Sequence, residues 1–443
     1  MITRKIACYR CGKLVEATPS VDKPYAASSF TIDKHYGCIC SNCLRELSKK
    51  DTILTANTAN AKSQAPQNIQ SKQSTMVEND RYRLNELKAI TSKYPCLDYS
   101  LESFVDIVKS EVFGQDEATE KVVFTLYTNQ FKCMLEDMGY ESDELNHLLL
   151  IGSTGVGKTF LAETALKALE IPYARSNADA ITSAGYIGDK VEAILERLYQ
   201  AANNDLELAQ NGVVVIDEID KKRRSDSSQR DINGLAVQQE LLKILEPNIV
   251  WINHGKTAFD TSHLTVILCG AFVGLDKIIK TRLYPQSIGF KSEESIDDDK
   301  LLKNVEPIDL VKYGFIEEFV GRAPTPIVLN NLSYFTILSI IQSKLAKKKS
   351  IFSAKNFELR IDELVLSKIA CRVMEHNTGA RDIKKELESL LYQAEYQVMN
   401  SRSGGSCDIN ENGDATVLYE DTKSKRLGIV ELIGKDYLLE DEP

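Results

Sequence analysis

The chain has 443 residues, of which 43% are hydrophobic and 27% are charged, a composition typical of folded proteins. Single cores stop growing at about 250–300 residues, so we expect two or three folding units. The formal net charge of −10 argues against nucleic acid as a partner. No segment approaches the roughly 20 consecutive apolar residues of a membrane span, and the first residues lack the apolar core of a signal peptide. We therefore expect a cytoplasmic protein without a membrane partner.

Two Cys-x-x-Cys pairs lie within the first 50 residues, Cys8 with Cys11 and Cys40 with Cys43. This spacing is typical of knuckles in which four thiolates bind Zn²⁺ tetrahedrally. We predict a zinc-binding domain over residues 1–50, which would gain its folding free energy from the metal. Cys38 is a further candidate ligand, and unrelated free thiols are the alternative.

The next segments differ sharply in composition. Residues 51–80 are rich in Ser, Thr, Asn, Gln and Ala and contain no aromatic residue, so we interpret residues 51–83 as a flexible linker. From residue 84, short apolar runs alternate with longer helical patterns, which is typical of parallel strands joined by crossover helices. The sequence predicts a doubly wound α/β domain over residues 84–324.

A glycine-rich segment after the first apolar run matches the phosphate-binding pattern G-x-x-x-x-G-K-[ST]. Its backbone N–H groups and the N-terminus of the following helix suit phosphate groups. Lys158 is expected to contact the β- and γ-phosphates, and Thr159 to bind Mg²⁺. A chance glycine-rich turn is the alternative, which the strand–loop–helix context disfavours. The expected nucleotide-binding residues are Gly152, Ser153, Thr154, Gly155, Val156, Gly157, Lys158 and Thr159.

A later apolar run, residues 213–216, ends in Asp217 and Glu218. Asp217 can join the shell of Mg²⁺, and Glu218 can polarise an attacking water. Such an ending is common in isolation, but after a phosphate-binding loop it is expected of a P-loop ATPase. The sequence therefore predicts ATP and Mg²⁺ as cofactors.

The C-terminal part is mainly helical in pattern. Leucine and isoleucine recur at helical spacing over residues 325–403, which predicts a small, mainly α-helical domain. Residues 404–443 contain one strand-like run near residue 430, and the pattern does not place them.

The motifs occur together in the order found in the ClpX family of AAA+ proteins. They are the phosphate-binding loop, AGYIG at 184–188, VVVIDEID at 213–220, RDING at 230–234, EFVGR at 318–322 and TGAR at 378–381. The chain between about residues 103 and 400 therefore resembles ClpX, an unfoldase that feeds a barrel-shaped peptidase. The resemblance implies an AAA+ P-loop NTPase with a small helical domain and an N-terminal zinc-binding domain.

The resemblance also implies catalytic roles. Glu218 resembles the catalytic base beside Asp217, Arg322 resembles the arginine finger that reaches a neighbouring subunit's nucleotide, and Arg381 resembles the arginine that reports nucleotide state to the small domain. A permanently charged guanidinium suits both arginine roles. A finger that acts on a neighbour implies a ring, here a homohexamer. Without the resemblance, both arginines would be interpreted as solvated.

Further residues match the family's contacts with other proteins. Tyr186 and Ile187 match a pore loop that grips translocating polypeptide, and Arg230 matches a second pore loop. The tripeptide Ile288, Gly289 and Phe290 matches the loop that docks on a ClpP-type serine peptidase. In this family the zinc-binding domain receives substrates and adaptor proteins. An ordinary turn with a packed tyrosine is the alternative for Tyr186.

These observations lead to one preferred function and two alternatives. The preferred function is an ATPase, not itself a peptidase, that unfolds tagged proteins and threads them into a ClpP-type peptidase. The first alternative is a stand-alone AAA+ chaperone that remodels protein complexes without proteolysis. The second is a zinc-ribbon protein that acts on DNA, which the acidic charge disfavours.

Overall fold

The computed structural model describes residues 4–7, 14–17, 30–33, 37–40, 90–181, 190–223, 231–284, 298–322, 326–376, 379–419 and 428–432. The chain divides into two units, Met1–Glu86 and Leu87–Pro443, and each is described by itself.

The described residues of the first unit form two antiparallel strand pairs. β1 (Arg4–Ala7) pairs with β2 (Leu14–Ala17), and β3 (Phe30–Asp33) pairs with β4 (Gly37–Cys40). Cys40 is the last residue of β4. Cys8, Cys11 and Cys43 lie outside the described residues, so the zinc site stays a prediction.

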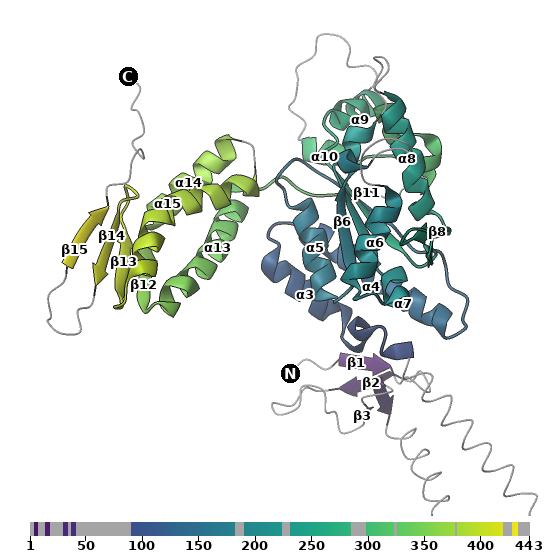
Figure 1. Ribbon diagram of the computed structural model, residues 1–443, viewed down its shortest axis with the longest axis horizontal. Helices are drawn as coiled ribbons and strands as arrows, with labels where there is room; N and C mark the ends of the chain where they lie inside the picture. The colour runs from purple at the N-terminus through teal and green to yellow at the C-terminus, as the bar shows by residue number, and fades with distance from the viewer. Residues whose placement is uncertain are drawn as a thin grey trace, which may run out of the picture. The chain divides into compact units, whose positions relative to one another are not determined.

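The large domain of the second unit is built on a five-stranded sheet with the order β11-β5-β10-β7-β6, of which Figure 1 labels β6 and β11. All four strand pairings are parallel. This confirms the predicted parallel α/β sheet, whose carboxyl ends meet at one edge. The strands are β5 (Leu148–Ile151), β6 (Tyr173–Asn177), β7 (Val213–Asp217), β10 (Thr265–Gly270) and β11 (Pro326–Val328).

Helices cover both faces of this sheet, and each face has its own apolar core. Leu148 and Leu150 pack with α3 to α5, whereas Leu149 and Ile151 pack with α6 and α8. Successive side chains of a strand point to opposite faces, so a strand that is apolar at every position supplies both cores. The helices are α3 (Leu101–Glu111), α4 (Asp116–Asp137), α5 (Lys158–Ala168), α6 (Val191–Ala201), α7 (Leu206–Gln210), α8 (Asp231–Leu245), α9 (Leu275–Leu283), α10 (Asp298–Leu302), α11 (Pro307–Tyr313) and α12 (Glu317–Arg322).

Short elements complete the large domain. The 3-10 turns are η1 (Pro95–Asp98), η2 (Ala178–Ala180) and η3 (Ile219–Lys222). β8 (Ile249–Ile252) and β9 (Thr257–Asp260) form an antiparallel hairpin. Val250 and Ile252 of β8 are buried and pack into the core, while Ile249 and Trp251 on its other face are exposed.

In the small domain, the described residues form three helices and a four-stranded sheet. These elements are α13 (Tyr334–Ala354), β12 (Phe357–Ile361), α14 (Glu363–Glu375), α15 (Ala380–Asn400), β13 (Gly405–Ile409), β14 (Ala415–Tyr419) and β15 (Gly428–Leu432). β12 and β13 are parallel, and the other two pairings are antiparallel. Cys407 and Val417 are fully buried in the core that the helices form. Residues after Ser403, which the sequence pattern did not place, therefore extend the small domain's sheet.

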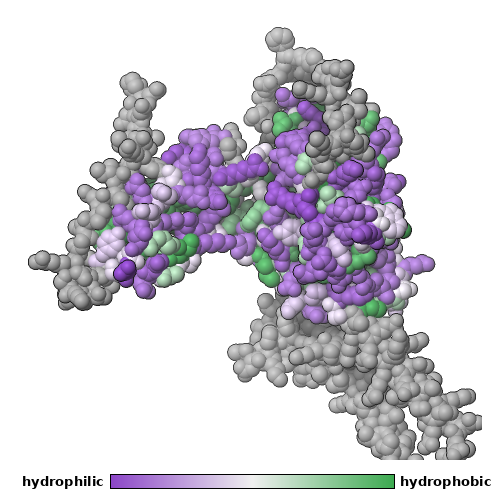
Figure 2. All heavy atoms as spheres, viewed as in Figure 1, coloured by the Kyte–Doolittle hydropathy of each residue, from purple (hydrophilic) through white to green (hydrophobic). Residues whose placement is uncertain are grey.

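The surface of the described residues is mainly hydrophilic, with hydrophobic side chains scattered over the face in Figure 2. Across those residues, no helix has both the length and the apolar content that crossing a bilayer requires.

Candidate nucleotide site

The loop between β5 and α5 adopts a conformation that requires glycine. Gly155 and Gly157 have φ values of +82° and +102°, in a region that side-chain-bearing residues rarely adopt. Gly157 immediately precedes Lys158, the first residue of α5, and no side chain of the described residues caps this helix. The first N–H groups of α5 are thus not bonded to a capping side chain, and together with the helix dipole they suit an anion.

This loop borders a cavity of about 450 Å³ that both domains line. Val112, Phe113, Leu332 and Ile340 line it together with polar and charged residues of the loop and of β7. Apolar surface beside a charged group is the combination that a nucleotide needs, since the faces of its base are flat and apolar and its phosphates are anionic. The cavity volume also falls within the usual range for small-ligand sites.

Lys158 is buried at the charged end of the cavity. Its Nζ donates hydrogen bonds to the carbonyl oxygens of Gly152 at 2.7 Å and Ser153 at 2.9 Å. Burial lowers the pKa of Lys158, because the charged ammonium loses solvation. Phosphate oxygens would restore that lost stabilisation, so the loop holds its ammonium ready for an anionic ligand.

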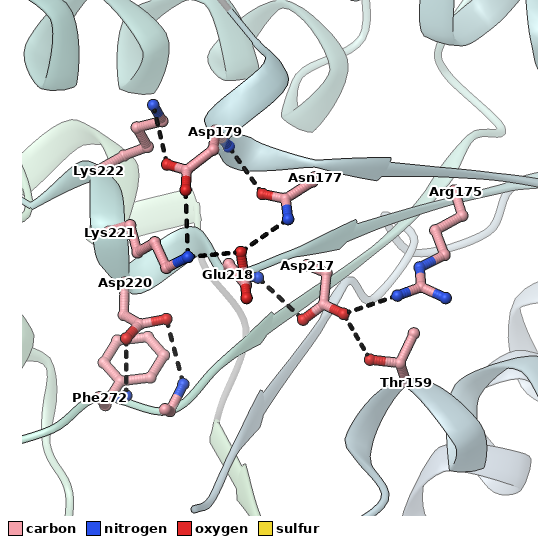
Figure 3. A network of polar contacts seen from close by, with 11 residues as sticks. Thr159, Arg175, Asn177, Asp179, Asp217, Glu218, Asp220, Lys221, Lys222 and Phe272 are labelled. Carbon is pink, nitrogen blue, oxygen red and sulfur yellow. Dashed lines mark hydrogen bonds and ion pairs between the residues drawn. The ribbon is translucent and has the colours of Figure 1, made fainter. Parts of the chain in front are cut away.

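Thr159 and Asp217 are brought together as the sequence predicts, although they lie on α5 and β7. The hydroxyl of Thr159 donates to Oδ2 of Asp217 at 2.7 Å (Figure 3). Asp217 is only 8% exposed, and the same Oδ2 accepts a hydrogen bond from Nη2 of Arg175 at 3.1 Å. Mg²⁺ prefers oxygen ligands, and here a hydroxyl oxygen and a carboxylate oxygen lie side by side, so these two residues fit the ion.

Glu218 has an unusual backbone conformation for a residue with a side chain, φ +59° and ψ +35°. Its Oε2 accepts hydrogen bonds from Nζ of Lys221 and Nδ2 of Asn177, both at 2.7 Å (Figure 3). The Lys221 bond first, and then the Asn177 bond, hold the pKa of Glu218 below its usual range. An ionised carboxylate at the mouth of the loop can accept a proton from water.

Asp220 connects η3 to the end of β10. Its carboxylate oxygens accept hydrogen bonds from the backbone N–H groups of Ala271 at 3.1 Å and Phe272 at 3.2 Å. The chain after Glu218 is therefore fixed to the neighbouring strand, which limits how far Glu218 can move.

The small domain reaches the phosphate-binding loop through its backbone. The N–H of Ala380 donates to the carbonyl oxygen of Gly155 at 3.0 Å. Gly379 has φ +63°, and a Cβ at this position would lie 2.7 Å from the carbonyl carbon and oxygen of Gly155. Arg381, which the sequence analysis predicted as a sensor of nucleotide state, follows directly and lines the cavity.

Comparison with known proteins identifies relatives of this chain. Residues 143–325 match the family model "AAA domain (Cdc48 subfamily)". The chain is 35% identical over 323 residues to the "ATP-dependent Clp protease ATP-binding subunit ClpX" of Treponema denticola, covering 68% of this chain and 77% of that protein. It is 36% identical over 312 residues to the protein of the same name from Borrelia duttonii, covering 66% and 72%.

The chain belongs to the ClpX family. This membership confirms the resemblance and, with the parallel sheet, the AAA+ fold. It also identifies the chain as an AAA+ ATPase, for which ATP and Mg²⁺ are the expected ligands.

Arg322, also predicted from the ClpX resemblance, is not among the residues that line this cavity. It lies at the end of α12 and donates Nε to Oε1 of Glu246 at 2.7 Å, with both side chains well exposed. The remaining predicted contacts lie outside the described residues, namely Tyr186, Ile187, Arg230, Ile288, Gly289 and Phe290.

Three residues in or next to the site lie outside the motifs named in the sequence analysis and were not predicted. Arg175 and Asn177 lie near the end of β6, where Asn177 is opposite Asp217 in the parallel register. Gln115, fully buried, donates Nε2 to the carbonyl oxygen of Asn330 at 2.8 Å and accepts from its N–H at 2.9 Å. If the pairing of β6 with β7 had been known, Arg175 and Asn177 could have been predicted. The alternation of strands and helices does not reveal which strands are neighbours.

Proposed function

We propose that this chain is an ATP-driven protein unfoldase and translocase that threads tagged substrates into a ClpP-type serine peptidase. One observation carries the proposal. The phosphate-binding loop is bonded to the small domain through Gly155 and Ala380, so a change at the phosphates acts on both domains. The relatives' names, subunits of an ATP-dependent Clp protease, support the choice of partner.

ATP hydrolysis follows from the residues at the cavity. Lys158 and the first N–H groups of α5 bind the phosphates. Thr159 and Asp217 would hold Mg²⁺, whose charge offsets that of the phosphates when it is bound. Glu218, kept ionised by Lys221 and Asn177, accepts the proton of the attacking water.

Conversion of hydrolysis into movement rests on the contact between the domains. Loss of the γ-phosphate changes what the loop around Gly155 binds, and the bond to Ala380 transmits that change to α15. Arg381, beside this bond, supplies a charge that responds to the phosphates. The two domains therefore rotate relative to each other as the site cycles.

The proposal requires a homohexameric ring. Arg322 is exposed and away from its own chain's cavity, which supports a role at the neighbouring subunit's nucleotide. We assign Tyr186, Ile187 and Arg230 to substrate-gripping pore loops. Residues 288–290 dock on the peptidase.

The N-terminal unit is proposed as a zinc-binding domain over residues 1–50. Its ligands are Cys8, Cys11, Cys40 and Cys43, and the pairing of β1 with β2 and of β3 with β4 supports two knuckles. This domain receives substrates or adaptor proteins and is joined by a linker over residues 51–83. We also propose a cytoplasmic location, where thiols stay reduced.

The decisive test is the variant Glu218→Gln in the full chain. Binding of a fluorescent ATP analogue is expected to persist, and turnover is expected to fall at least about 1,000-fold, since the amide cannot accept the proton. Glu117→Gln is the matched control, because Glu117 is exposed on α4 and pairs with Lys121. Normal turnover in Glu218→Gln would contradict the catalytic assignment.

The partner is tested by degradation of a tagged fluorescent protein. With ATP and a ClpP-type peptidase, fluorescence should disappear and peptides should accumulate, and Phe290→Ala should abolish the peptides. Fluorescence loss that needs no peptidase and yields no peptides would replace the proposal with stand-alone remodelling.

The shared site is tested by mixing inactive subunits. Arg322→Ala and Glu218→Gln should each be inactive alone, and their mixture should regain ATPase activity. In the mixture, a Glu218→Gln subunit supplies Arg322 to a neighbouring Arg322→Ala subunit, whose own Glu218 is unchanged. A mixture as inactive as its components would place Arg322 outside the neighbouring site.

A further inference from the structure

Arg175 extends from β6 into the end of the cavity where Mg²⁺ is expected. Its Nη2 lies 3.1 Å from Oδ2 of Asp217, and its Nη1 lies 3.2 Å from Oε1 of Glu163 (Figure 3 shows the first pair). The Asp217 side chain is only 11% exposed, whereas that of Arg175 is 52% exposed. The guanidinium therefore enters from the solvent side and ends on a buried carboxylate.

The contact involves the atom that a metal ion would use. Oδ2 of Asp217 accepts hydrogen bonds from both Thr159 and Arg175. Mg²⁺ bound by Thr159 and Asp217 would meet the positive charge of Arg175 at the same oxygen. Two cations this close repel each other strongly, and Mg²⁺ requires strict octahedral geometry, so the guanidinium and the ion exclude each other at this atom.

A second carboxylate offers the guanidinium a place to go. Glu163 lies one turn after Thr159 on α5, so both side chains lie on the same side of the helix. Because Arg175 already pairs with Glu163, it can release Asp217 and keep an ionic partner. The exchange then costs one hydrogen bond and leaves no unpaired buried charge.

We propose that Arg175 competes with Mg²⁺ for Asp217 and thereby sets the Mg²⁺ concentration at which the site binds nucleotide. Glu163 is the alternative ionic partner of Arg175 and holds the guanidinium away from Asp217 once the ion is bound. Arg175 is thus a positioning residue, which acts through Asp217. The proposal rests on the assignment of Thr159 and Asp217 to Mg²⁺ under the proposed function.

The experiment measures the Mg²⁺ concentration needed for half-maximal binding of a fluorescent ADP analogue by the full chain. A diphosphate is used because it binds Mg²⁺ in solution more weakly than a triphosphate, so the midpoint reports on the protein. The variant Arg175→Met keeps the length of the side chain and removes the charge. Its midpoint is expected about tenfold below that of the unmodified chain, as loss of one charge-assisted competitor predicts.

Two further variants distinguish competition from a structural role. Arg175→Lys keeps the charge and should retain a midpoint close to the original. Glu163→Gln removes the alternative partner, so Arg175 is held more tightly by Asp217 and the midpoint should rise. A merely structural ion pair would not shift the midpoint in opposite directions.

The proposal fails if Arg175→Met leaves the midpoint unchanged, since Arg175 would then form an ordinary surface ion pair. It also fails if Arg175→Met raises the midpoint, which would make Arg175 a direct phosphate ligand. If the unmodified chain binds no nucleotide at saturating Mg²⁺, the assignment of the site itself is wrong. That result is separate, because it appears before any variant is compared.

Discussion

The two walls of the nucleotide cavity are built differently. On the large-domain wall, side chains make the contacts: Lys158 bonds to loop carbonyls, Thr159 bonds to Asp217, and Glu218 accepts two hydrogen bonds. On the small-domain wall, the contact with the loop is between backbones, from the N–H of Ala380 to the carbonyl of Gly155.

This difference suggests that the large-domain wall carries the residues for binding and hydrolysis, whereas the small-domain wall transmits conformational change between the domains. The large-domain wall depends on which functional groups are present, so changes of charge there should alter binding and catalysis. The small-domain wall depends on close approach without a side chain, because a Cβ on Gly379 would collide with Gly155. Added bulk there should uncouple the domains while nucleotide binding persists.

The largest effect is expected from Lys158→Ala on the large-domain wall. Loss of the charge-assisted contacts to phosphate should weaken binding of a fluorescent ATP analogue about 100-fold, equal to about 3 kcal/mol. Lys167→Ala, at the other end of α5, should retain affinity. If the Lys158 variant and the unmodified chain bind nucleotide equally well, side chains do not determine nucleotide binding at this wall.

On the small-domain wall, Gly379→Ala should impair ATPase-driven protein unfolding more than nucleotide binding. A positive φ and the clash with Gly155 together cost about 1–3 kcal/mol, so ATPase-driven unfolding should fall about 5- to 150-fold, with nucleotide affinity nearly unchanged. Gly139→Ala is the matched control, because Gly139 has φ +81° and a Cβ there would meet nothing within 4 Å. If nucleotide affinity falls as far as unfolding does, the two walls are not distinct.

The pH dependence tests the tuning of Glu218. Lys221 lowers the pKa of Glu218, so the carboxylate stays ionised as the pH falls. Lys221→Met should raise that pKa towards its ordinary value, and Glu218 should therefore take up its proton at higher pH. The acid limb of the ATPase profile should move to higher pH, whereas Lys222→Met, whose lysine pairs with Asp179, should leave it in place. An unchanged limb in Lys221→Met would remove Glu218 as the titrating group.

The smallest effect is expected at Gln115, which bonds the start of the small domain to the large one. Gln115→Leu keeps the volume but leaves the N–H and carbonyl of Asn330 unpaired, which should lower the free energy of unfolding by about 1–3 kcal/mol. Asn330→Ala preserves those backbone groups and is the control in urea unfolding. No loss of stability would mean that water replaces Gln115.

Local patterns predicted the core of this site well. The pattern from Gly152 to Thr159 predicts a loop, a lysine and the start of a helix in direct succession, and the structure has all three. The position of Asp217 beside Thr159 could also be predicted, because carboxyl ends of parallel strands meet at one edge.

What escaped prediction depends on contacts between distant segments. Arg175 and Asn177 reach the site only because β6 is the neighbour of β7. The apolar runs of the sequence indicate where strands lie in the chain but do not determine their order in the sheet. β13 and β14 were missed because each is five residues long and half-buried, although Cys407 and Ile409, like Ala415 and Val417, alternate as a strand requires. Gly379 belongs to the TGAR motif, but the reason why it must lack a Cβ is its close approach to Gly155, which the sequence does not reveal.

The order of synthesis gives the parallel pairing of β12 with β13 a further consequence. β12 leaves the ribosome before α14 and α15, yet its partner is made only after both helices. Phe357 and Leu359, buried in the finished domain, have only α13 to pack against during that interval, and an unpaired apolar strand invites aggregation. The small domain therefore matures only after β13 has been made, when the large domain has already had time to fold.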